Sequence, residues 1–97
     1  MTKQLRFAVD IWTHSKGPIS PLVPINTFVF FADEGETFSI RDIYDKVIEF
    51  IKENNGIDYH DLRVEPFEFG FRIKSWVYDS YNFKRTKIFY VNNLRQL

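Results

Sequence analysis

The stretch SIRDIYDKVIEFIKENNG, residues 39–56, decides the fold, because it carries the clearest helical pattern in this chain of 97 residues. Its apolar side chains recur three and four positions apart, which places them on one face of a helix. These residues are Ile40, Ile43, Tyr44, Val47, Ile48 and Ile51. Ser39 is a favourable N-cap, and Gly56 can adopt the left-handed conformation that ends many helices. The pattern predicts one amphipathic helix over residues 40–54.

Five further segments have the patterns of β-strands. We expect strands at residues 4–12, 25–32, 62–64, 67–74 and 84–91. The first alternates between apolar and polar residues, which is typical of a strand with one buried face, whereas the second is apolar on both faces. Together with the helix, these segments predict the order strand, strand, helix, strand, strand, strand. A chain of this length forms one compact unit, so we expect a single α+β domain over residues 1–97.

The apolar faces of these elements predict the core. We expect Ile43, Val47 and Ile51 on the helix to pack against Phe7 and Val9 on the first strand. The strand at residues 67–74 should add to this core its alternating residues Phe67, Phe69, Phe71 and Ile73.

The segment GETFSIRDIYDKVIEFIKENNGIDYHDLRV, residues 35–64, resembles the ubiquitin-like β-grasp domains. In that family a Thr-containing loop enters one amphipathic helix, the helix ends at Gly, and a polar turn leads into a strand with a Leu–Arg pair. The matching residues are Thr37, Ile40, Ile43, Val47, Gly56, Asp58, Leu62 and Arg63. The resemblance implies a mixed β-sheet with one helix packed on one face. The chain departs from the family in its long proline-containing first connection, its longer 67–91 hairpin and its ending LRQL, which lacks the Gly-Gly of conjugated members.

Composition excludes several classes of protein. The chain has no cysteine, which rules out disulfides, thiolate catalysis and thiolate metal sites. No apolar run follows the first charged residues, and none approaches about 18 residues, so we expect neither a signal peptide nor a membrane span. These features predict a cytoplasmic protein.

No arrangement of catalytic residues is apparent. Asp58, His60 and Asp61 form a weak candidate for a divalent-ion site, but a solvated turn after a helix is the better interpretation of these residues. His14 has no neighbouring metal ligand at a helical spacing. Asp10 is the one acid within an apolar strand, and alternation places it on the outer face, away from the burial that acid–base catalysis requires. We therefore expect no enzyme activity, no metal site and no cofactor.

The net charge of zero conceals an asymmetry. Residues 1–65 hold 7 Lys and Arg against 11 Asp and Glu, whereas residues 66–97 hold 6 against 2. In the second part, aromatic rings that the core does not require lie among the basic residues. The candidate binding residues are Arg72, Lys74, Trp76, Tyr78, Lys84, Arg85, Lys87 and Tyr90. Rings interleaved with positive charges are typical of protein hot spots and of nucleic-acid grooves, but a solvated edge hairpin explains them as well.

These residues lead us to expect a non-enzymatic binding module that acts through protein–protein interaction. Small chains of this kind often serve as adaptors, or as inhibitors encoded by viruses and mobile elements. Nucleic-acid binding through residues 67–91 is the alternative, and the neutral overall charge argues against it. A subunit of a larger assembly is a third interpretation. We expect a protein partner and no membrane partner.

The proline-rich segment at residues 16–24 bears on assembly. Its prolines Pro18, Pro21 and Pro24 have the spacing of a polyproline II helix, but a stiff connecting loop is the better interpretation than a ligand motif. The apolar strand at residues 25–32 is expected at a sheet edge, where such a strand needs covering. We expect this loop to cover it, and a second chain is the alternative, so the chain is predicted to be a monomer or a weak homodimer.

Overall fold

The structure, a computed structural model, describes residues 3–15, 20–35, 40–54 and 58–97. The elements run in the order β1 (Gln4–His14), β2 (Leu22–Asp33), α1 (Ile40–Asn54), β3 (His60–Phe67), β4 (Gly70–Tyr78) and β5 (Lys84–Gln96). This order confirms the predicted α+β arrangement, and α1 begins and ends where the sequence predicts. The signals proposed for its ends, Ser39 and Gly56, lie outside the described residues.

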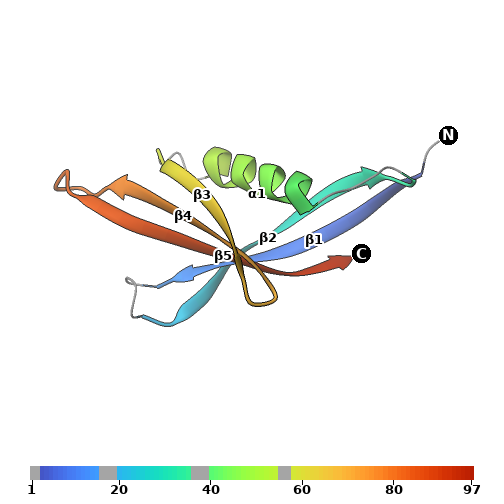
Figure 1. Ribbon diagram of the computed structural model, residues 1–97, viewed down its shortest axis with the longest axis horizontal. Coiled ribbons are helices and arrows are strands. Elements are labelled where there is room, and N and C mark those ends of the chain that lie inside the picture. The colour runs from blue at the N-terminus through green and yellow to red at the C-terminus, as the bar shows by residue number, and fades with distance from the viewer. Residues whose placement is uncertain (1–2, 16–19, 36–39, 55–57) are drawn as a thin grey trace.

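The five strands form one sheet in the order β2-β1-β5-β4-β3, with α1 lying across one of its faces (Figure 1). All four neighbouring pairs are antiparallel. The expectation of a mixed sheet is therefore wrong. The cause is the crossover through α1, after which β3 runs in the same direction as β2. The two turns that follow leave β5 in that direction too, so β5 lies antiparallel to β1. The ubiquitin-like resemblance of residues 35–64 stays a prediction.

The core lies between α1 and the face of the sheet beneath it. Val47 is fully buried, and Ile43 and Ile51 are each 3% exposed. They pack against residues of the central strands, among them Val9, Phe71, Ile73, Phe89 and Val91. The predicted helix face is thus confirmed, as are Val9, Phe71 and Ile73, and Phe7 packs at the border of the core.

Phe67 and Phe69 do not belong to the buried face on which the sequence places them. The chain turns between these residues and β4, because Phe67 pairs directly with Gly70 and leaves Glu68 and Phe69 as a two-residue loop. Phe69 at the tip of this hairpin is 97% exposed. The strand predicted at residues 62–64 instead runs on through Pro66, which is tolerated because β3 is at the edge of the sheet.

The proline-rich segment does not cover β2 with the part that the structure describes. Leu22, Val23 and Pro24 belong to β2 itself, where they pair with residues of β1. The register shifts next to Pro24, as is usual for a proline within a sheet. Pro18 lies outside the described residues. The predicted edge position of β2 is confirmed.

In the part of the chain that the structure describes, the helix is too short and too polar to cross a bilayer.

Replacing Val47 by Asp should abolish folding. The carboxylate would enter the fully buried centre of the core without a partner, at a cost of several kcal/mol against a total stability of about 5–15 kcal/mol. Loss of the cooperative transition in circular dichroism would show this. Arg41→Asp, on the exposed first turn of α1, is the matched control and should remain folded. A cooperative Val47→Asp variant would show that this helix face is not the core.

Candidate binding face

The face of the sheet opposite α1, called the open face below, carries a row of side chains across four strands. Trp12 of β1 lies opposite Tyr90 of β5, Tyr90 opposite Arg72 of β4, and Arg72 opposite Glu65 of β3. Directly opposite residues in an antiparallel sheet point to the same side, so these side chains form one continuous band. Along β1, the neighbours of Trp12 are Ile11 and Thr13, which point to the α1 side of the sheet and are buried there.

The ring of Trp76 is held in place by its neighbours. His60 of β3 stacks on it with ring centroids 4.2 Å apart, and the Lys84 ammonium of β5 lies 4.5 Å from its centroid. Tyr78 meets the same ring edge-on at 5.1 Å. Stacking and cation–π contacts of this kind leave Trp76 with one preferred orientation.

Glu65 balances two of the positive charges on the open face. Its carboxylate accepts a hydrogen bond from Arg72 Nε and lies 3.2 Å from Lys74 Nζ. The hydrogen bond from Arg72, followed by that from Lys74, holds the pKa of Glu65 below its ordinary value. The Arg72 guanidinium also lies 5.0 Å from the ring centroid of Phe67, so Arg72 links the charged cluster to the aromatic one.

A hollow of about 230 Å³ lies at the middle of the open face, beside the β3–β4 hairpin. Trp12, Phe67 and Tyr90 are among the aromatic residues that line it. Their positions are fixed by further contacts: Trp12 Nε1 donates a hydrogen bond of 3.0 Å to Asn92 Oδ1, and Phe67 meets Tyr90 at 5.0 Å. The Tyr90 hydroxyl in turn lies 3.2 Å from His14 Nε2. Besides these rings, the lining includes two polar side chains, Glu68 and Asn92.

Gly70 allows the hairpin to approach β5 closely enough to form this hollow. A Cβ atom at this position would lie 2.0 Å from the carbonyl oxygen of Val91, which is a backbone atom and cannot turn aside. The position therefore requires glycine for space.

Asp10 lies opposite Asn92, at the border of the hollow, and organises this part of the open face. Its carboxylate accepts hydrogen bonds from Asn93 Nδ2 at 2.9 Å and from Thr27 Oγ1 at 3.0 Å, and Arg95 Nη1 lies 3.3 Å away. The bond from Asn93 is the main cause that lowers the pKa of Asp10, and Thr27 and Arg95 add to it. Asn93 has a φ of 57°, at a position where the register between β1 and β5 shifts. Asn tolerates this left-handed conformation better than most residues.

The structure divides the eight candidate binding residues between the two faces. Those on the open face are Arg72, Lys74, Trp76, Tyr78, Lys84 and Tyr90. Arg85 and Lys87 are on the other face, because they lie opposite Val77 and Ser75 in the β4–β5 pair. Arg85 is bound there to Asp79 at 2.8 Å, and its hydrogen bond lowers the pKa of Asp79.

Several residues join the open face that the sequence did not assign to it. They are Trp12, His14, His60, Glu65 and Phe67. The alternation of apolar and polar residues along β1 already places Trp12 on the outer face, so its position on the open face could be predicted from the sequence. His60 carried no such signal, because the strand containing it was predicted to begin two residues later, at Leu62.

The weak metal candidate does not converge on one point. His60 Nε2 lies 3.5 Å from Asp58, but its ring stacks on Trp76, and Asp61 pairs with Arg63 at 3.1 Å. Within the described ranges no group of three His, Cys, Asp or Glu side chains is arranged to hold a metal ion.

Comparison of the chain with protein-family models, with curated proteins and with solved structures found no match. The function of the chain must therefore be inferred from the open face itself.

Replacing Gly70 by Ala should destabilise the protein by about 1–3 kcal/mol, as overpacking against a fixed backbone atom usually does. Urea unfolding followed by fluorescence measures this loss. Phe69→Ala changes the neighbouring, exposed residue and should stay within about 0.5 kcal/mol of the parent. Equal stability of both variants would contradict the close approach at Gly70.

Replacing Asp10 by Asn should lower stability at neutral pH but matter little in acid. The folded-state pKa of Asp10 lies below its ordinary value of 3.8, so its stabilisation is present above that pH. It is lost as the pH falls through the folded-state pKa. Urea unfolding at a series of pH values should show the parent and Asp10→Asn converging below about pH 4. Thr27→Val, which removes one of the hydrogen bonds, should give a smaller effect of the same shape. A difference that is constant with pH would contradict this role.

Proposed function

We propose that this chain is a non-enzymatic binding module that engages a protein partner through the open face. The observation that carries the proposal is the hollow of about 230 Å³ bordered by Trp12, Phe67 and Tyr90. Interfaces between proteins concentrate their binding energy in such places, where an apolar or aromatic anchor of one partner enters a pocket of the other.

The fixed orientation of the rings supports this proposal. Trp76 is held between His60 and Lys84, and Tyr90 between Phe67 and His14. Side chains that are already ordered lose little conformational freedom on binding, which leaves more of the contact energy as affinity. Trp, Tyr and Arg are also the residue types most enriched at hot spots.

The balance of charges favours protein over nucleic acid. Arg72 and Lys74 already contact Glu65, and Arg95 contacts Asp10, so a phosphate would have to compete with these carboxylates. Nucleic-acid grooves also offer ring faces on which bases stack, whereas the ring of Trp76 is occupied by His60 and Lys84. The partner that suits this face presents an apolar side chain to the hollow and a carboxylate to Lys84, whose ammonium lies against the ring of Trp76. The proposal retains the adaptor or inhibitor role, and the cytoplasmic setting, that the sequence predicts.

The test exploits the division of the lysines between the two faces. The double variant Lys74→Glu/Lys84→Glu reverses two charges on the open face, and both side chains are solvent-accessible. It loses the Lys74–Glu65 pair and sets two carboxylates side by side there, so its melting temperature should fall by a few degrees while the protein stays folded. Capture of protein partners from nuclease-treated native lysate should be lost. Lys87→Glu, on the opposite face, is the matched control and should capture the same partners as the parent.

The salt dependence separates the two kinds of partner. A captured protein should remain bound between roughly 50 and 200 mM salt, whereas a nucleic acid engaging 6–10 phosphates would lose about 10³–10⁵ in affinity over that range. Binding of a single-stranded oligonucleotide by the parent, lost in the double variant, would favour the nucleic-acid alternative. Equal capture by the double variant and by Lys87→Glu would refute a role for the open face.

A further inference from the structure

The strand β2 differs from the rest of the sheet in what it leaves exposed. It pairs with β1 on one side, and no strand in the described part of the chain pairs with its other side. On the open face it presents Val29 and Phe31, which are 42% and 53% exposed, and Ile25, which is 44% exposed. An edge of this kind offers both unpaired backbone groups and apolar surface.

The opposite edge of the same sheet is protected against further pairing. Strand β3 contains Pro66, charged residues on alternate positions, and a register shift between His60 and Arg63 with Asp61 at a φ of 54°. Prolines, charges and bulges are the features that prevent edge strands from pairing with other chains. Strand β2 has such features only near its ends, at Pro24 with its register shift and at Asp33. From Asn26 to Ala32 it contains no proline and no charged residue, and its pairing with β1 is regular.

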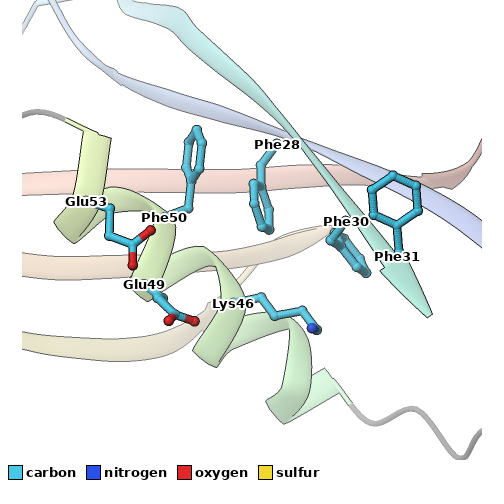
Figure 2. A pocket seen from close by; sticks show the side chains of 7 residues that line it. All are labelled: Phe28, Phe30, Phe31, Lys46, Glu49, Phe50 and Glu53. Atoms are coloured by element: carbon cyan, nitrogen blue, oxygen red, sulfur yellow. The ribbon is translucent and has the colours of Figure 1, made fainter. Parts of the chain in front are cut away.

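A groove of about 350 Å³ continues from this edge onto the helix side of the sheet. Figure 2 shows Phe28 and Phe30 of β2 at this groove together with Phe50 of α1, and the Phe28 and Phe50 rings lie 4.6 Å apart. Its helix side carries one base, Lys46, and two acids, Glu49 and Glu53 (Figure 2). The groove therefore accepts apolar rings that arrive beside β2.

From these observations we infer that a second copy of this chain pairs its β2 edge, antiparallel, with the β2 edge of the first. In such a dimer the uncharged segment of each copy covers the same segment of the other, as the symmetry of a two-fold interface requires. A two-fold axis perpendicular to the sheet leaves both helices on the same side of the joined sheet. One residue of β2 then lies opposite the same residue of the second copy. Placed at Val29, near the middle of the uncharged run, the axis sets Phe28 opposite Phe30 of the second copy, with all four rings at the two grooves. A strongly charged peptide strand would find no counterpart on β2, because no charged residue occurs between Leu22 and Ala32.

The dimer is distinct from the proposed partner interface. It uses the outer side of β2, whereas the hollow lies beside the β3–β4 hairpin and Tyr90 of β5. The two sites can be occupied together, and each can be lost by mutation without the other.

Charge reversal at the axis is the first test. Val29→Lys places two ammonium groups opposite each other and should convert a dimer in sedimentation velocity into a monomer, as should Val29→Glu. A mixture of the two variants should reassociate, because opposite charges then face each other. Leu94→Lys, an aliphatic residue of β5 with similar exposure, should stay dimeric. A parent that is monomeric at every concentration, or a dimer that Val29→Lys leaves intact, would overturn the inference.

Cross-linking tests the register directly. The chain has no cysteine, so Val29→Cys introduces a single thiol. Opposite residues of an antiparallel pair have Cα atoms about 4.5–5.5 Å apart, within the range of about 4.4–6.8 Å that a disulfide spans. Mild oxidation should link Val29→Cys into a covalent dimer far faster than Leu94→Cys. Equal rates in the two variants would show that β2 does not pair with itself about Val29.

Discussion

One helix must cover a sheet that has two faces, and this constraint governs the rest of the molecule. The 15 residues of α1 span about 22 Å, whereas the longest dimension of the protein is 53 Å. Val47 and its neighbours on the helix bury the middle of one face, around Ile73 and Phe89. The other face receives no such cover from the described elements, so it is built from rings and ion pairs that water tolerates. The open face is the consequence of having a single helix, and the β2 edge is that of a sheet that does not close.

Much of the fold was predictable from local pattern, and the errors arose in the connections between elements. The helix and the number and order of strands followed from periodicity, because each element buries one face. Phe67 and Phe69 were assigned to the wrong face because a two-residue hairpin switches the face of the sheet on which odd-numbered residues lie. Phe67 pairs with Gly70, so odd-numbered residues before the turn share a face with even-numbered residues after it. Unbroken alternation through the turn gave no sign of this reversal. The antiparallel direction of β5 against β1 depended on the crossover through α1, which sets β3 in the direction of β2.

The candidate site was predictable only within each strand. Alternation along β4 grouped Arg72, Lys74 and Trp76 correctly, and the same rule applied to β5 would have separated Lys84 from Arg85 and Lys87. The partners of these residues come from strands distant in sequence: His60 lies opposite Trp76, and Trp12 opposite Tyr90. Which strand lies beside which is a property of the whole sheet, so no local pattern reports it. Glu65 also illustrates this limit, because its role in balancing Arg72 and Lys74 depends on the β3–β4 register.

The central position of β5 in the sheet constrains when the protein can fold during its synthesis. The strand made last of the five lies between β1 and β4, and it supplies Phe89 and Val91 to the core. Until it has left the ribosome, the nascent chain holds two separate hairpins, which are marginally stable in water. Pairings such as Phe7 with Gln96 join residues from nearly opposite ends of the sequence, and contacts of this range slow folding. A ribosome that stalls before β5 would therefore present the apolar β2 segment, unprotected by a finished fold, to neighbouring chains.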